Sequence, residues 1–135
     1  SRFSQDVYLQ DIVPTTLELA NIPIPNEIDF KSFYPIINNN EEKSLHNGIY
    51  GTFGCCPPKY KDFQRMIRKD GFKLMAFPVN KRIELYNIDI DPFEKENLSD
   101  IPLYKNKIKD MMADLILLQK DVNDTLNLRK IFELN

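Results

Sequence analysis

The clearest hydrophobic pattern in the chain lies towards its C-terminus. Apolar residues recur there in steps of three and four, at Tyr104, Ile108, Met111, Leu115, Leu118 and Val122. Residues at this spacing fall on one side of an α-helix, and the lysines and aspartates between them fall mostly elsewhere around it. The pattern predicts a helix over about 102–124 with one buried side.

A second pattern, over residues 48–88, is typical of β-structure. The predicted strands are GIYGTFG, with Ile49 and Phe53 as anchors, then QRMIRK, FKLMAFP and RIELYNI. Asp70-Gly71 is a strong hairpin signal because both turn positions favour positive φ, and PVNK predicts a further turn. We predict an α+β fold, in which a small antiparallel sheet of three to four strands packs against the long helix.

The first 38 residues predict shorter elements. DVYLQ, residues 6–10, predicts a short strand, and IVPTTLELA after Asp11 predicts a short helix with Pro14 in its first turn. Its expected buried stripe is Val13, Leu17 and Ala20.

Asn21 suits a left-handed helix stop. DFKSFYPII predicts a further helical turn or two, with Asp29 as its cap.

Composition narrows the function classes. The 135 residues are enough for one domain, and 42% are hydrophobic and 28% charged, as in an ordinary globular protein. A net charge of −2 gives no basic surface for nucleic acid and no polybasic membrane anchor. No apolar run approaches a membrane span, and two cysteines are too few for a disulfide framework.

Two groups of chemistry-bearing residues favour structural interpretations. The turn after residue 88 carries Asp89, Asp91 and Glu94, but a calcium loop needs a glycine at its sixth position and a glutamate at its twelfth, which are Glu94 and Asp100 here. A turn shaped by Pro92 is the better interpretation. The lone His46 is expected to be a solvated loop residue, because no defined partner or zinc-ligand set accompanies it.

The basic residues of the hairpins allow two interpretations. They are Arg65, Arg68, Lys69, Lys73, Lys81 and Arg82. A solvated face with acidic neighbours is the usual one. A patch that meets an anionic substrate is the alternative.

Four segments, in order, resemble motifs of the sulfatases, members of the alkaline-phosphatase superfamily. They are DIVPTTLELANIPIP, DFKSFYPII, RMIRKDGFKLMAFP and ELYNIDIDPFEKENLSD, and together they span most of residues 6–122. The positions that carry the motifs include Pro14, Thr15, Gly71, Lys73, Asp91, Pro92, Glu94, Asn97 and Leu98. All four belong to the C-terminal third of a sulfatase.

The resemblance implies a division of labour with a separate catalytic domain. Residues 1–38 would lead from that domain, and residues 39–135 would form the C-terminal subdomain. The sheet of the subdomain would pack beside the catalytic domain, and its loops would form part of the pocket wall. The full-length enzyme would hydrolyse sulfate esters of a saccharide or an aryl group, with a calcium ion and a formylglycine nucleophile. Sulfatases of this type are usually periplasmic or secreted.

Cys55 stands in a sequence that superficially resembles the formylglycine motif, Cys-x-Pro-Ser-Arg. Here Pro58 replaces the serine, Lys59 replaces the arginine, and the segment lies downstream of the Pro-Thr helix rather than far upstream. Arginine is not replaced by lysine without cost at a site of fork geometry. We therefore expect no catalytic residue and no cofactor site in this chain.

Loops carry specificity more often than the scaffold beneath them. We therefore expect substrate-rim contacts from His46, Tyr50, Lys59 and Arg65. Two alternatives stay open: a free-standing, non-catalytic binding module, and the tail of a related phosphatase or phosphodiesterase.

Overall fold

The computed structural model describes residues 5–39, 44–54 and 63–134. It divides into two compact units, Ser1–Asn47 and Gly48–Asn135. Each unit is described by itself.

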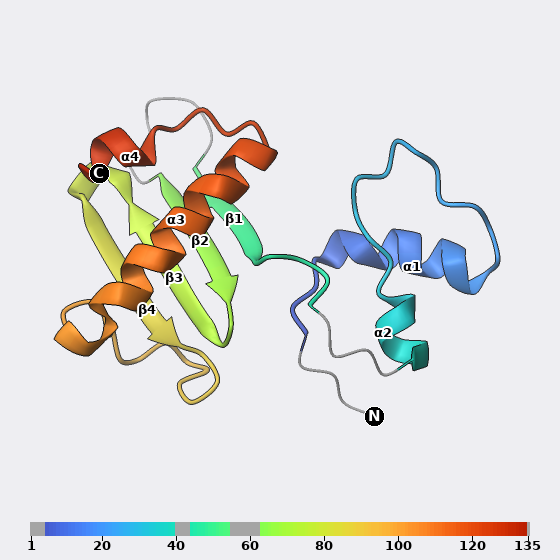
Figure 1. Ribbon diagram of the computed structural model, residues 1–135, viewed down its shortest axis with the longest axis horizontal. Coiled ribbons are helices and arrows are strands. Elements are labelled where there is room, and N and C mark those ends of the chain that lie inside the picture. Colours follow the sequence, from blue (N-terminus) through green and yellow to red (C-terminus); the bar gives the residue numbers. More distant parts are fainter. Residues whose placement is uncertain (1–4, 40–43, 55–62, 135) are drawn as a thin grey trace. The chain divides into compact units, whose positions relative to one another are not determined.

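The larger unit contains a four-stranded antiparallel sheet in the order β1-β2-β3-β4 (Figure 1). Its strands are β1 (Ile49–Phe53), β2 (Gln64–Lys69), β3 (Phe72–Phe77) and β4 (Arg82–Asn87). The predicted meander is confirmed. Phe53 is not an anchor, because its side chain is 64% exposed at the end of an edge strand.

The β2–β3 hairpin turns as its sequence predicts. Asp70 and Gly71 both have positive φ, at 50° and 73°. Gly71 is required for a second reason: a Cβ there would lie 2.0 Å from Oδ2 of Asp89. The carbonyl of Gly71 accepts a hydrogen bond of 2.8 Å from Ile88 N, which connects this hairpin to the end of β4.

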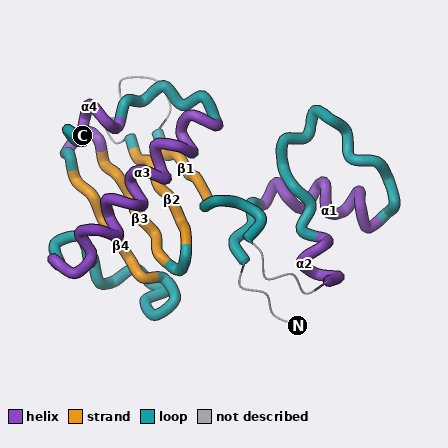
Figure 2. The backbone as a smooth tube through the Cα atoms, in the orientation of Figure 1, coloured by secondary structure: helices purple, strands orange, loops and turns teal. Residues whose placement is uncertain are grey.

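Helix α3 (Lys105–Asp121) lies across one face of this sheet (Figure 2). A short 3-10 turn, η3 (Pro102–Tyr104), precedes it. Ile67, Leu74 and Leu85 stand in register on β2, β3 and β4 and are fully buried. The helix meets this row with Met111 and Leu115.

The predicted face of the helix is partly corrected. Met112 and Ile116 are also buried, so the covered stripe is wider than predicted. Val122 is 55% exposed because the helix ends at Asp121 and the chain turns away. A short helix that the sequence patterns did not predict, α4 (Leu128–Ile131), closes the core with the buried Leu128.

The smaller unit contains η1 (Leu9–Asp11), α1 (Ile12–Leu19) and α2 (Tyr34–Asn39). The strand predicted at 6–10 is wrong, because Leu9–Asp11 form a 3-10 turn that continues into α1. Asn21 has φ 54° and ends the helix as predicted. Asp29 does not cap α2, since the helix begins later and Ser32 Oγ accepts the Tyr34 N–H at 3.1 Å.

The predicted buried stripe of α1 is wrong at two of its three positions, and the third, Leu17, is half-buried. Val13 and Ala20 are exposed, whereas Asp11, Pro14 and Thr15 are buried. The side chains of Asp11 and Thr15 hold the inner side of the helix through hydrogen bonds to distant segments. Polar anchoring, not hydrophobic burial, therefore sets which side of α1 faces inward.

Candidate functional site

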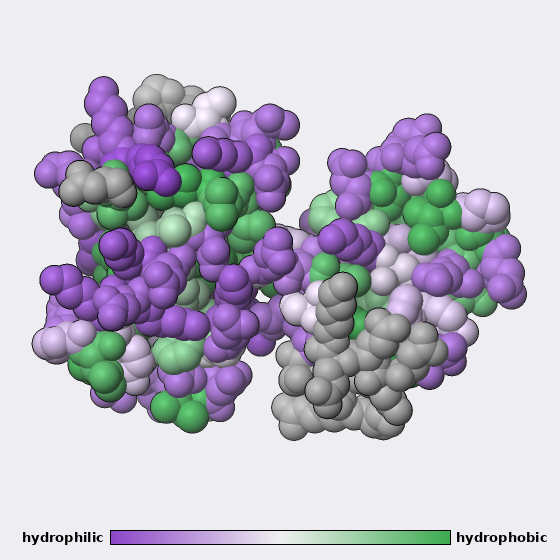
Figure 3. All heavy atoms as spheres, in the orientation of Figure 1, coloured by the Kyte–Doolittle hydropathy of each residue, from purple (hydrophilic) through white to green (hydrophobic). Residues whose placement is uncertain are grey.

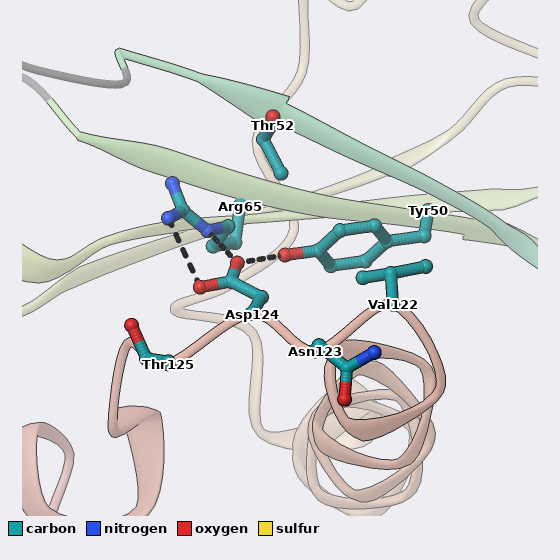
Figure 4. Close-up of a pocket in the computed structure, with 7 residues that line it drawn as sticks. All are labelled: Tyr50, Thr52, Arg65, Val122, Asn123, Asp124 and Thr125. Atoms are coloured by element: carbon teal, nitrogen blue, oxygen red, sulfur yellow. Dashed lines mark hydrogen bonds and ion pairs between the residues drawn. The ribbon is translucent and has the colours of Figure 1, made fainter.

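The side chain of Asp124 connects the segment after α3 to the first two strands of the sheet in the larger unit. Asp124 follows α3, where Asn123 adopts φ 54° and Asp124 N donates to Gln119 O at 2.9 Å. This left-handed step ends the helix and turns the chain back towards the sheet. The carboxylate of Asp124 then lies between Arg65 of β2 and Tyr50 of β1 (Figure 4).

Every nitrogen of the Arg65 guanidinium has an acceptor. Nε donates to Oδ2 of Asp124, and Nη2 donates to Oδ1 at 3.3 Å. Nη1 donates to Gln64 O at 2.9 Å. Tyr50 donates its hydroxyl to the same carboxylate. Only 10% of the Arg65 side chain and 12% of the Asp124 side chain are exposed. The ion pair is therefore almost dehydrated and internally satisfied.

The surroundings set the protonation states of this cluster. Burial favours a protonated Asp124, but the hydrogen bonds from Arg65 and Tyr50 outweigh it and hold the pKa of Asp124 well below its usual range. Burial, followed by the hydrogen bond to Asp124, raises the pKa of Tyr50 well above its usual range. Near neutral pH the Asp124 side chain is therefore an ionised carboxylate and the Tyr50 side chain a neutral phenol.

The cluster forms the floor of an open depression of about 480 Å³. The residues that line it are Tyr50, Thr52, Arg65, Val122, Asn123, Asp124 and Thr125. Thr52, Asn123 and Thr125 are exposed and present two hydroxyls and one amide. Because the charge of Arg65 is balanced by Asp124, the depression is suited to neutral hydroxyl-bearing groups rather than to an isolated anion.

The smaller unit contains a second polar cluster, centred on the fully buried Asp11. Its Oδ2 accepts hydrogen bonds from Tyr8 N at 2.7 Å and from His46 Nε2 at 2.8 Å, and its Oδ1 accepts one from Lys31 N at 3.1 Å. The expectation of a solvated His46 is therefore wrong. Its side chain is 13% exposed, and the Tyr8 ring lies edge-on at 4.8 Å.

The predicted rim residues fall into different places. Tyr50 and Arg65 are brought together by Asp124 in the larger unit, whereas His46 belongs to the smaller one. Lys59 lies outside the described residues, as do Cys55 and Cys56.

The acidic turn after β4 is held by the hydrogen bonds expected of a structural turn. Asp91 Oδ2 accepts from Glu96 N at 2.9 Å, and Asn97 Oδ1 accepts from Leu85 N at 3.1 Å. Glu94 pairs with Lys73 at 2.8 Å. Among residues 5–39, 44–54 and 63–134, no group of three or more His, Cys, Asp or Glu side chains is placed to hold a metal ion.

Sequence patterns missed the two carboxylates that organise these clusters. Asp11 was expected only to precede a helix, and Asp124 had no assigned role. The available signals are slight: Asp11 opens the Pro-Thr motif, and Asn123-Asp124 follows the last turn of an amphipathic helix. Neither signal indicates partners that lie 20 to 59 residues away.

The folds of known structures agree with this architecture. A 2-O GAG sulfatase superposes with a TM-score of 0.73 at 25% identity, over 84% of this chain and 25% of that chain. A phosphonate monoester hydrolase of Agrobacterium radiobacter superposes with a TM-score of 0.61 over 82% of this chain and 24% of that one. At 19% identity, the latter shares the fold alone.

Sequence comparisons give relatives of two lengths. An uncharacterised protein of Haemophilus influenzae is 34% identical over 121 residues, which are 89% of this chain and 60% of that protein. An ulvan-active sulfatase of Formosa agariphila is 26% identical over 94% of this chain, yet only 31% of the sulfatase is covered.

The N-sulphoglucosamine sulphohydrolase C-terminal family model matches residues 2–121. This match confirms the resemblance to the C-terminal part of a sulfatase. It covers most of the chain, and we conclude that the chain belongs to this family of sulfatase C-terminal domains.

Proposed function

We propose that this chain is the C-terminal domain of an enzyme that hydrolyses sulfate esters of a saccharide. The observation that carries the proposal is the family match over residues 2–121. Two relatives support the saccharide class, since one is an ulvan-active sulfatase and another a 2-O GAG sulfatase. Its principal partner would then be the catalytic domain of the same enzyme, and we propose a periplasmic or secreted location for it.

The calcium ion and formylglycine that sulfatases imply do not fit the described residues. Asp11 uses its oxygens on two backbone N–H groups and His46, and Asp124 is neutralised by Arg65. Asp91 accepts a backbone N–H, and Glu94 is paired with Lys73. We therefore assign both groups, and the chemical steps of hydrolysis, to the catalytic domain.

The contribution proposed for this chain is part of the substrate rim. Thr52 and Thr125 are exposed and line the depression around the Arg65–Asp124 pair, at the end of the sheet from which the β1–β2 connection departs. Arg65 would act through Asp124 as a positioning residue, and Tyr50 would complete the floor. Contacts from Lys59 and His46 stay predictions.

The rim proposal has a kinetic test in the full-length enzyme. Thr52→Val and Thr125→Val should each raise KM about 3- to 10-fold, because each removes one hydrogen bond to substrate, and should leave kcat unchanged. Lys95→Met, at the opposite end of the sheet, is the matched control. Unchanged KM values in both threonine variants would refute the rim.

The hydrolase proposal is tested on the native protein. An antibody raised against this chain recovers the antigen from its source, and sulfate release is measured with N-, 2-O- and 6-O-sulfated saccharides and an aryl sulfate, with calcium present. We expect the antibody to detect a band several times larger than 15.9 kDa, and the recovered protein to release sulfate. Failure to release sulfate from any of these substrates would overturn the proposal.

One observation favours a second candidate, a free-standing non-catalytic module. The Haemophilus influenzae relative is 60% covered by this chain, so it is much shorter than the sulfatases. A native band at 15.9 kDa would support this candidate.

The helices of the described residues contain no candidate for a membrane span.

A further inference from the structure

Asp11, just before helix α1, and Pro14 and Thr15 within it are buried in the smaller unit. Leu17 is half-buried, and the other apolar residues of the helix, Ile12, Val13 and Leu19, are exposed. Asp11 and Thr15 are 0% and 3% exposed, whereas Val13 and Leu19 are 55% and 57% exposed. This differs from the usual arrangement of a surface helix, whose apolar stripe faces the core.

Hydrogen bonds fix this orientation. Thr15 Oγ1 donates to the Asp11 carbonyl at 2.6 Å and accepts the Phe33 N–H at 3.0 Å. The Asp11 carboxylate accepts the Lys31 N–H. Rotating the helix to bury its apolar side would leave these groups without partners, at a cost of about 1–3 kcal/mol for each buried group.

The exposed side of α1 is continuous and uncharged. It consists of Ile12, Val13, Thr16, Leu19 and Ala20. At 100° per residue these five positions fall within one third of the helix circumference, and Glu18 falls on the opposite side. We call them the outer face of α1.

Hydrophobic residues extend beyond the outer face. Leu9 precedes it, and Ile22 and Ile24 follow it, all exposed. Figure 3 shows hydrophobic residues reaching the surface of this unit around α1 and the segment after it. A contiguous uncharged patch of this kind is typical of the core of a permanent interface.

We propose that the outer face of α1 docks on the catalytic domain of the same enzyme, an inference that rests on the proposed function. The 2-O GAG sulfatase contains this fold within a chain of which only 25% is matched. The remaining three quarters supplies a covalently linked partner, so the face needs no second molecule to be covered. The two small residues, Thr16 and Ala20, allow a partner surface to approach the helix closely.

The test compares solvent labelling of two proteins. Hydroxyl-radical footprinting is applied to the full-length enzyme and to the 135-residue chain, with a reporter peptide in each tube to fix the radical dose. We expect Val13 and Leu19 to be labelled about fivefold less or lower in the full-length enzyme, since an interface core loses most of its solvent contact. Leu115, fully buried here, should be protected in both samples and reports folding.

A pair of variants adds an independent measurement. Leu19→Lys should lower the thermal midpoint of the full-length enzyme by about 5 °C or more, because it places a charge in a dry interface, and should barely change that of the 135-residue chain. Leu19→Met keeps the apolar contact and should leave both midpoints unchanged.

The outcomes separate this inference from the hydrolase proposal. Equal labelling of Val13 and Leu19 in the two proteins overturns the docking. Protection of these residues already in the 135-residue chain, by its own residues or by a second copy, also overturns it. If that full-length sample still releases sulfate, the hydrolase proposal survives. Protection without sulfate release has the opposite meaning: the docking stands and the hydrolase proposal fails.

Discussion

Asp124 binds Arg65 across 59 residues of sequence, and this pair ties the segment after α3 to the second strand of the sheet. The hydroxyl of Tyr50 joins the same carboxylate from the edge strand. The three side chains therefore hold together the end of the helix and the strands on either side of the β1–β2 connection, where we propose the substrate rim.

Removing the cation alone should be costly. Arg65→Met leaves the Asp124 carboxylate buried without its partner, and we expect a loss of about 3–5 kcal/mol in the free energy of unfolding. Adding Asp124→Asn should restore part of this loss, because asparagine removes the buried charge, keeps an acceptor for Leu126 N and offers an NH2 group that can donate to the Tyr50 hydroxyl oxygen. Chemical denaturation followed by circular dichroism measures both changes.

The exposed pair Lys81–Glu133 provides the control for this cycle. Lys81→Met should leave the unfolding midpoint unchanged, because both partners are in water. If the double variant proved less stable than the sum of the single variants predicts, the role assigned to the ion pair would be wrong.

The same pair predicts how stability changes in acid. The pKa of Asp124 is lowered on folding, below the value of about 3.9 expected for an unfolded aspartate. The stabilisation is therefore fully present above about pH 5 and declines as the pH falls below about 4, where the unfolded chain takes up a proton first. The stability difference between the native chain and Asp124→Asn should narrow from about pH 6 to pH 3. A difference that stays constant over this range would contradict the prediction.

Local patterns predicted the elements whose partners are close in sequence. Asp70-Gly71 fixed a hairpin because its backbone angles are a property of two adjacent residues, and the β-runs gave strands within one or two residues of their observed bounds. The wide stripe of α3 was underestimated because a four-stranded sheet covers more of a helix than one row of side chains.

Long-range polar contacts were not predictable in this way. The Asp11–His46 pair spans 35 residues, and nothing in either local sequence indicates the other partner. The orientation of α1 was predicted wrongly for a related reason. A hydrophobic pattern indicates which side of a helix becomes buried, but not whether the burying surface belongs to the same unit.

Gly71 should tolerate no side chain. Gly71→Ala forces a Cβ into a left-handed conformation, which costs about 1–2 kcal/mol, and into contact with the Asp89 carboxylate. Adding Asp89→Ala removes the contact but not the backbone strain, so it should recover only part of the lost stability. Thermal unfolding of the two variants and of Asp89→Ala alone separates the two contributions. Complete recovery would show that the backbone angle costs nothing.

Asp11 should hold the smaller unit together through three segments at once. Asp11→Ala removes the acceptor of Tyr8 N, Lys31 N and His46 Nε2, and the amides of Tyr8 and Lys31 should then exchange about tenfold faster with solvent, as expected for the loss of one hydrogen bond each. His46→Gln leaves the Asp11 carboxylate in place, so both amides should keep most of their protection.

Hydrogen exchange of Tyr8 and Lys31 therefore distinguishes an anchor from a mere neighbour of the histidine. Equal exchange rates in Asp11→Ala and the native chain would show that the carboxylate does not hold these segments. Because the same hydrogen bonds keep the outer face of α1 turned outward, loss of protection in Asp11→Ala should also reduce radical labelling of Val13 and Leu19 in the 135-residue chain, as the freed helix buries its apolar side.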